Sequence, residues 1–215
     1  MDLQQKFSFK FSFKKFLNQK KQALSKKDKS AKKEIDEKAK EVVDVINKND
    51  FMFTTSSCAG RAILMRESGK KQKGAIIKAW HEKIKLSDLQ HQLEELKHKK
   101  DSQKDSQMIY FKFEPPIYHV ICFDFDTAAK LVNIARQIGF KKSGFYYGKR
   151  KFPVVEIRGS EEISLPIFFR NTIVDSGYLK LLIKEVNKKF EQIWKKQKKL
   201  KAMIKNLMKD QNIKT

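Results

Sequence analysis

The chain has 215 residues and 40% of them are apolar, so it can form a substantial hydrophobic core in one domain or in two small halves. It contains only two cysteines and no apolar run long enough to span a bilayer, which excludes a disulfide framework and a transmembrane helix. Its N-terminus shows no signal-peptide pattern and its cysteines are few, so a cytoplasmic protein is expected. Its formal net charge is +23.

Most of the positive charge lies at the two ends of the chain. Residues 1–33 contain eleven Lys and two Asp, and residues 188–215 contain ten Lys, one Glu and one Asp. Basic arms of this kind are typical of proteins that bind nucleic acid. The alternatives are a general lysine bias of the proteome and a heat-adapted surface.

The first half of the chain begins with alternating Phe residues over 7–16, which have the period of a strand. This segment predicts an arm that docks its Phe side chains on the body, an aromatic segment for RNA, or disorder. Residues 14–27 have a helix-compatible composition. A helix is predicted over 35–49, followed by strands at about 51–57, 61–67 and 74–80, with a basic turn over 68–73.

The second half continues with a helix over 88–99, capped by Ser87, and a polar linker over 99–107. Strands at about 108–114 and 117–124 flank Pro115 and Pro116, which limit pairing there. A helix over 126–138 has Asp126 and Gly139 in capping positions. Strands follow near 143–148, 152–159 and 165–169.

The last predicted element is a long helix that starts near Ser176. From Val186 its apolar residues recur at spacings of 4, 3, 7, 4 and 3, with Gln197 interrupting the apolar face. A helix that frays beyond about residue 200 is the alternative. The absence of a regular βαβ alternation argues against a Rossmann-type sheet. We therefore expect an α+β fold with mixed or antiparallel sheets, packed helices and a long C-terminal helix, and duplicated halves remain an open alternative.

The segment Thr54-Thr55-Ser56-Ser57-Cys58-Ala59-Gly60-Arg61 lies between two apolar runs and is predicted to be a polar turn joining two strands. Oriented hydroxyls and backbone amides near an arginine suit an anionic or polar ligand. The alternative is a hairpin that is merely rich in Ser and Thr.

This segment resembles the signature of the tRNA wybutosine-synthesising protein 3 family. Other segments resemble the same family in the same order, so that the resemblance covers about residues 16–195; they are Asp28–Asp36, Lys78–His81, Phe111–Pro115, His119–Cys122, Gly139–Gly144, Val155–Arg158, Tyr178-Leu179 and Asn187. Trp80-His81 is similar to the archaeal branch. Lys33 departs from the pattern, because the family usually has a glycine there.

The resemblance implies an S-adenosylmethionine-dependent methyltransferase that methylates N4 of the tricyclic wybutosine-precursor base, derived from guanosine-37, in tRNA(Phe). The chain has no G-x-G-x-x-G motif, so the cofactor is expected in a different kind of pocket from that of a dinucleotide fold. Two alternatives stay open, a non-enzymatic RNA-binding protein and another tRNA-base-modifying enzyme on the same scaffold.

The acceptor nitrogen that the resemblance implies must lose a proton, and the candidate bases are His119, Glu114 and His81. His119 with Glu114 is favoured because both flank the Pro115-Pro116 bend. A histidine that only finds a structural hydrogen-bond partner is the alternative for each.

Substrate or cofactor contacts are expected from Arg61 and Arg158, whose planar forks suit phosphate or carboxylate, and from Trp80, which can stack on a base or be a core residue. The remaining candidate contacts lie in the matched segments and are Thr55, Ser56, Ser57, Cys58, Gly60, Lys112, Ser143 and Gly144.

No metal site is expected. The soft ligands are too few, and the odd spacing of His119 and Cys122 on a strand places them on opposite faces. We expect three regions: a basic N-terminal extension over 1–15, a methyltransferase domain over 16–195, and a lysine-rich helical tail over 196–215.

Overall fold

The computed structural model describes residues 3–25, 37–67, 75–98, 108–147, 151–170 and 172–212. The matched segment 28–36 with Lys33, the basic turn over 68–73 and the linker over 99–107 lie outside the described residues. The chain divides into two compact units. Unit 1 contains Met1–Ala59, Pro116–Ser160 and Lys195–Thr215, and unit 2 contains Gly60–Pro115 and Glu161–Trp194. The chain therefore passes from one unit to the other inside the Thr54–Arg61 segment and again between Pro115 and Pro116.

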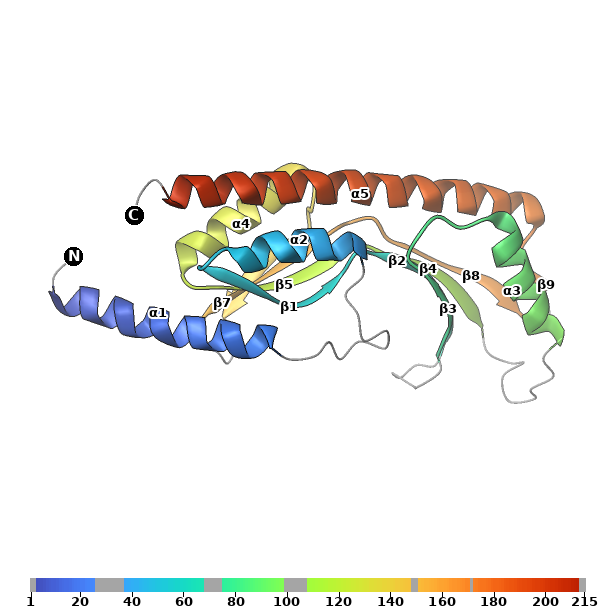
Figure 1. The fold of residues 1–215 in the computed structure, drawn as a ribbon. Helices are drawn as coiled ribbons and strands as arrows, with labels where there is room; N and C mark the ends of the chain where they lie inside the picture. Colours follow the sequence, from blue (N-terminus) through green and yellow to red (C-terminus); the bar gives the residue numbers. More distant parts are fainter. Residues whose placement is uncertain are drawn as a thin grey trace. The chain divides into compact units, whose positions relative to one another are not determined.

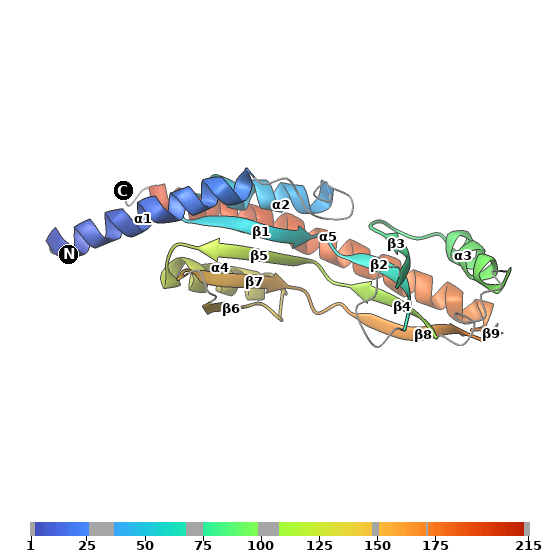
Figure 2. The ribbon, with the colours of Figure 1, turned by 90° about the horizontal axis from the view of Figure 1, so that it is seen from below.

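Unit 1 is built on a four-stranded antiparallel sheet (Figure 1). Its strands, in spatial order, are β1 (Met52–Cys58), β5 (Ile117–Cys122), β7 (Pro153–Arg158) and β6 (Gly144–Tyr147). Helices α2 (Glu37–Lys48) and α4 (Phe125–Ile138) and the last part of α5 (Ser176–Asn212) cover one face, here called the inner face. Helix α1 (Leu3–Leu24) lies on the opposite, outer face, on the side of β1 (Figure 2).

Helix α4 has clear signals at both ends. Asp124 is its N-cap, and its carboxylate accepts a hydrogen bond from the Thr127 amide at 2.7 Å. Asp126, the predicted cap, instead lies inside the first turn. Gly139 ends the helix with a left-handed backbone at φ 108°, as predicted, because glycine adopts this conformation without steric cost.

The N-terminal Phe residues belong to α1, so the strand period noted over 7–16 was misleading. Phe13 and Phe16 are three residues apart and share one side of this helix. Phe16 is fully buried, and the centre of its ring lies 5.3 Å from the ring centre of Phe53 and 5.1 Å from that of Phe152. Aromatic packing on the outer face therefore holds α1 to the sheet, as docking of the Phe side chains implied.

This packing predicts that Phe16→Ala lowers the free energy of unfolding by about 3–5 kcal/mol, because it leaves a large cavity among aromatic rings. Leu17→Ala is the matched control, since Leu17 is the next residue of α1 and is 36% exposed. Chemical denaturation of the two variants measures the difference. Equal losses for the two variants would show that α1 does not depend on this contact.

Unit 2 is built on a five-stranded antiparallel sheet with the spatial order β3 (Ile76–Trp80), β2 (Arg61–Arg66), β4 (Ile109–Glu114), β8 (Ile163–Phe169) and β9 (Thr172–Ile173). Helix α3 (Leu86–His98) and the first part of α5 pack their apolar residues on this sheet. Ser87 lies within the first turn of α3, where its hydroxyl contacts the Asp88 carboxylate, so it is not the predicted cap. Strand β9 was not predicted.

Helix α5 continues well beyond residue 200. Leu200 and Ile204 are both fully buried in the core of unit 1, and Lys201 forms an ion pair with Glu41 at 2.9 Å. A helix frayed from residue 200 is therefore wrong. The α+β class, the antiparallel sheets and the long C-terminal helix are confirmed. In the part of the chain that the structure describes, no helix has the length and apolar character to cross a membrane.

Candidate active site

The segment Thr54–Arg61 is not a turn between paired strands. Thr54–Cys58 lie in β1, which pairs with β5, whereas Arg61 opens β2 in the other sheet. Ala59 and Gly60 form the break, and Gly60 has φ 91°, which a residue with a Cβ rarely adopts.

A bulge at Thr55 decides which hydroxyls of β1 face outward. Thr54 pairs with Val120 and Ser56 with His119, so Thr55 is an extra residue without an opposite partner. Thr54 points inward and its hydroxyl donates to Asn47 of α2 at 3.0 Å. If residues 54–56 formed a regular strand without the bulge, Ser56 would point inward like Thr54, because alternate residues share a face. The bulge instead turns Ser56 to the outer face.

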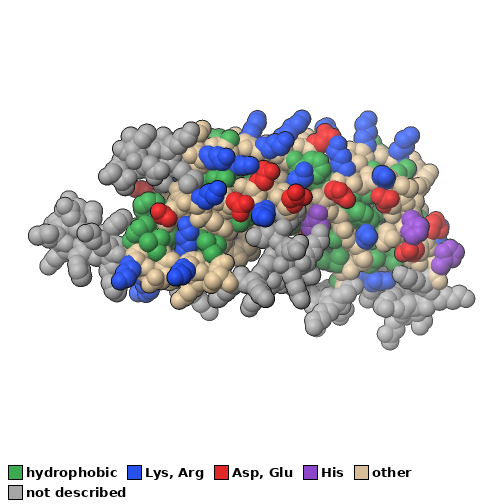
Figure 3. Space-filling view, in the orientation of Figure 1, with side chains coloured by type: hydrophobic (Ala, Val, Ile, Leu, Met, Phe, Trp, Pro, Cys, Tyr) green, Lys and Arg blue, Asp and Glu red, His purple; other side chains and the backbone are tan. Residues whose placement is uncertain are grey.

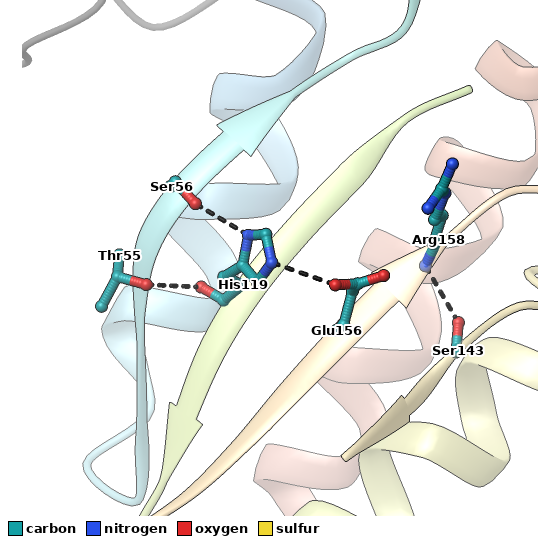
Figure 4. A network of polar contacts seen from close by, with 6 residues as sticks. All are labelled: Thr55, Ser56, His119, Ser143, Glu156 and Arg158. Carbon is teal, nitrogen blue, oxygen red and sulfur yellow. Dashed lines mark hydrogen bonds and ion pairs between the residues drawn. The ribbon is translucent and has the colours of Figure 1, made fainter. Parts of the chain in front are cut away.

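On this outer face, three polar side chains lie in one row across the strands (Figure 4). The Oγ atom of Ser56 lies 2.8 Å from Nδ1 of His119, and Nε2 of His119 lies 3.2 Å from the Glu156 carboxylate. About 30% of each of the His119 and Glu156 side chains is exposed, so the row is accessible. We call Ser56, His119 and Glu156 the polar row.

Residues around the polar row fix its strands. The Thr55 hydroxyl donates to the His119 carbonyl at 3.4 Å. The Ser143 hydroxyl accepts a hydrogen bond from the Arg158 amide at 3.1 Å, which fastens the start of β6 to the end of β7 (Figure 4). The register places Cys58, Ile117 and Arg158 in the next row of the same face. Gly144 pairs with Glu156 and continues the polar row onto β6.

A buried glutamine holds the end of β1. The Gln197 side chain of α5 donates to the Ala59 carbonyl at 3.2 Å and to the Tyr118 hydroxyl at 2.8 Å. The sequence pattern marked Gln197 only as an interruption of an apolar face. It is in fact the polar group that satisfies the carbonyl beside Gly60, because a buried carbonyl without a partner is costly.

The other predicted site residues lie in unit 2. Arg61 and Glu114 pair in register on β2 and β4, and the Nε of Arg61 donates to Glu114 at 2.7 Å. His119 and Glu114, the two favoured candidate bases, make separate contacts, because the carboxylate that meets His119 is Glu156. A role of Glu114 as a base stays a prediction. Lys112 lies with its ammonium 5.5 Å from the centre of the Tyr110 ring.

Trp80 and His81 lie at the end of β3. Trp80 is only 9% exposed and packs near Phe111, with ring centres 6.4 Å apart, so it is a core residue. His81 is half-buried in the connection that follows. The Asn187 side chain fixes this connection by two hydrogen bonds of 2.9 Å to the backbone of Ile84.

The two cysteines differ in environment. Cys58 is half-buried on the outer face, whereas Cys122 is buried on the inner face. Burial, and secondarily the nearby Asp124 carboxylate, raises the pKa of the Cys122 thiol well above its usual range. His119 and Cys122 lie on opposite faces, as their spacing predicted. Among the described residues, no group of three or more His, Cys, Asp or Glu could hold a metal ion.

This difference predicts that iodoacetamide at pH 8 leaves Cys122 unmodified in the folded protein, because the reactive thiolate does not form there. In guanidinium chloride both cysteines should react. Mass spectrometry of proteolytic peptides distinguishes the two sites. Alkylation of Cys122 in the native state at the rate seen after unfolding would contradict the buried, protonated thiol.

Comparison with known proteins identifies the family. The family model described as Methyltransferase TYW3 matches residues 14–206, which is most of the chain. The chain belongs to this family.

Relatives in the TYW3 family include proteins from animals and archaea. The mouse tRNA wybutosine-synthesizing protein 3 homolog is 33% identical over 177 residues, which cover 80% of this chain and 65% of the mouse protein. The chain thus matches somewhat less than two thirds of that relative. A Thermococcus sibiricus protein is 31% identical over 175 residues, covering 79% of this chain and 85% of the relative. Its name is tRNA(Phe) 7-((3-amino-3-carboxypropyl)-4-demethylwyosine(37)-N(4))-methyltransferase.

The fold is also that of a solved structure. The PH1069 protein from Pyrococcus horikoshii superimposes with a TM-score of 0.73 at 28% identity, covering 91% of this chain and 95% of the other. The description of the family, Methyltransferase TYW3, names transfer of a methyl group, a reaction that uses a methyl donor. The polar row places a histidine between a hydroxyl and a carboxylate, which are groups suited to proton transfer.

Proposed function

We propose that the protein transfers a methyl group from S-adenosylmethionine to N4 of the tricyclic base at position 37 of tRNA(Phe). The polar row carries this proposal, because it places a histidine between a hydroxyl and a carboxylate on an accessible face. The archaeal relatives named as N4-methyltransferases support the choice of base and atom. A cytoplasmic location stays a prediction.

The polar row suits removal of a proton from the acceptor nitrogen. An ionised carboxylate only accepts hydrogen bonds, so Glu156 takes the bond from Nε2–H of His119 and leaves Nδ1 as an acceptor for the Ser56 hydroxyl. When bound, S-adenosylmethionine would supply the methyl group and leave as S-adenosylhomocysteine. During this transfer Ser56 Oγ would accept the N4 proton and pass its own proton to Nδ1 of His119. Glu156 then stabilises the imidazolium. His119 is the base, Ser56 relays the proton, and Glu156 orients the ring.

The residues of the outer face fit the methyl donor in chemical type. S-adenosylmethionine supplies an electrophilic methyl group on a sulfonium, together with an amino-carboxypropyl group and an adenosine. Arg158 lies on the same face as the polar row and offers a fork for the carboxylate. Thr55 of β1 offers a hydroxyl, whereas Ser57 pairs with the core residue Tyr118 and lies on the inner face. Cys58 and Gly144 border the row, and Ser143 supports the Arg158 backbone.

The predicted site residues in unit 2 are proposed to contact the substrate or to support the site. Arg61 is held by Glu114, which presents the guanidinium in a fixed orientation for a phosphate or carboxylate. Lys112 and His81 are proposed contacts to the substrate, and Gly60 supplies the backbone break after β1. Trp80 acts by supporting β3 from the core, because little of its ring is exposed.

Lysines of α5 and of the two basic ends of the chain are proposed to bind the tRNA backbone. On α5 the buried residues Val186, Phe190, Ile193 and Leu200 define one side. Exposed lysines recur on the other side, where Figure 3 shows a line of basic side chains. We call four of them the lysine stripe, Lys184, Lys188, Lys195 and Lys199. The lysine-rich residues 1–15 and 196–215 are proposed as further contacts to the tRNA backbone.

Calorimetry with S-adenosylmethionine and a methylation assay on tRNA(Phe) carrying the 4-demethylated tricyclic base test the function. Mass analysis of the digested tRNA should show one added methyl group at N4. RNA binding without donor binding or methylation would instead favour a non-enzymatic RNA-binding protein. A methyl group on another atom or another nucleoside would favour a different base-modifying enzyme on this scaffold.

A further inference from the structure

An exposed tyrosine lies on the same face as the polar row. Tyr146 of β6 pairs with Val154 of β7, Val154 pairs with Ile121 of β5, and Ile121 pairs with Phe53 of β1. This row across the sheet is next to the polar row. Residues opposite each other in an antiparallel sheet point to the same side. Tyr146 is therefore on the outer face, where 52% of it is exposed. The mechanism above does not use it.

The surface at the end of the polar row is open at Gly144, two residues before Tyr146 on β6. Gly144 continues the polar row opposite Glu156, and a Cβ built on it would meet no atom within 4 Å. Its φ is not positive, so neither backbone conformation nor packing within the protein requires a glycine there. The absence of a side chain instead leaves room for a flat group beside Glu156.

Positive charge flanks this aromatic surface. Lys141 and Lys142 precede β6, Lys151 follows it, and all three are exposed. Aromatic rings interleaved with lysines are typical of surfaces that bind single-stranded nucleic acid, where rings stack on bases and ammonium groups neutralise phosphates. The charge favours a polyanion over the methyl donor, because the donor carries a cationic sulfonium and no phosphate.

We propose that Tyr146 is a stacking platform for an unpaired base of the substrate RNA, the neighbour of the base that is methylated. Tyr146 lies two strands across and two residues along from His119, on the order of 12 Å away. At this distance, Tyr146 is too far away to stack on a base that contacts His119. It can instead stack on the base of the adjacent nucleotide. This inference rests on the proposed function for the identity of the RNA.

Binding of an anticodon stem-loop RNA of tRNA(Phe) to Tyr146→Ala, Tyr146→Phe and Tyr147→Ala tests the platform. Loss of one stacked base weakens affinity by about 5- to 150-fold, so Tyr146→Ala should fall in that range. Tyr146→Phe keeps the ring and should stay within about threefold of wild type. Tyr147 is the matched control, because it follows in the same strand, is 61% exposed and points to the other side.

Two further measurements separate stacking from other causes. The slope of log affinity against log salt should not change in Tyr146→Ala, because no phosphate contact is lost. Affinity for S-adenosylmethionine should also not change, and a loss there in place of RNA affinity would assign Tyr146 to the donor's adenine and overturn the proposal. Equal RNA losses in Tyr146→Ala and Tyr147→Ala, or none in either, would overturn it too.

Failure of this inference is distinguishable from failure of the proposed function. Wild-type protein that binds the RNA but does not methylate tRNA(Phe) would refute the function and leave the binding comparison valid. Normal methylation by wild type with unchanged RNA affinity in Tyr146→Ala would refute the platform alone.

Discussion

Replacing His119 by alanine is expected to lower kcat for methyl transfer by at least about 100-fold, the usual range for losing a general base. The RNA and donor affinities should remain within a few-fold of wild type, because His119 acts on a proton and leaves most binding contacts intact. Single-turnover kinetics at saturating tRNA measures the chemical step. Glu156→Gln should slow the same step less, since it leaves His119 in place but removes the charge that stabilises the imidazolium.

His91→Ala is the matched control, because His91 lies on α3 with 71% of its side chain exposed. It should retain full activity. A His119→Ala protein that is folded and methylates at the wild-type rate would remove the polar row from the mechanism. Loss of donor binding in that variant, with chemistry unaffected at saturation, would make His119 a binding residue.

Replacing the lysine stripe with glutamines should weaken tRNA binding at least tenfold near physiological salt and flatten its salt dependence. Each phosphate contact contributes about 0.7–0.9 to the slope of log affinity against log salt, so four lost contacts lower the slope by about 3. Binding titrations across a salt series give this slope. Donor affinity should not change, because these lysines lie on the far side of α5 from the core.

A charge-matched control separates this local effect from the net charge. It replaces four exposed lysines elsewhere by glutamine, Lys40, Lys48, Lys85 and Lys130. An equal change of slope in both variants would show a diffuse electrostatic effect without a defined RNA-binding surface. Deletion of residues 201–215 is unsuitable here, because it would remove Ile204 from the core along with the charges.

Local sequence patterns predicted the elements better than their partners. The helix expected over 126–138 is found at Phe125–Ile138. Its end at Gly139 was predicted because glycine readily adopts the left-handed conformation that ends a helix. By contrast, the two strands on either side of Gly60 were expected to pair. A polar stretch with a glycine fits a hairpin and a crossing between sheets equally well, because tertiary contacts alone decide the partner.

The site residues show the same limit. Ser56 and His119 were predicted individually, but Glu156 is 37 residues from His119 in the chain and meets it only through the register of β5 and β7. The strand period noted for the N-terminal Phe residues was misleading for a related reason. Their spacing of two fits a strand, and the spacing of three between Phe13 and Phe16 also fits a helix face. Burial against Phe53 and Phe152 favours the helix.

The bulge at Thr55 makes this one position of β1 dispensable for the register of the strand. A homologue that lacked only the residue between Thr54 and Ser56 would have a regular strand there, with the hydroxyl at position 56 still opposite His119 on the outer face. Sequence comparisons across this family should therefore treat a single-residue gap at position 55 as compatible with the site, whereas a gap elsewhere in β1 moves the residues beyond it to the other face. The same rule guides engineering, because β1 can be shortened by one residue at the bulge without exchanging its inner and outer side chains.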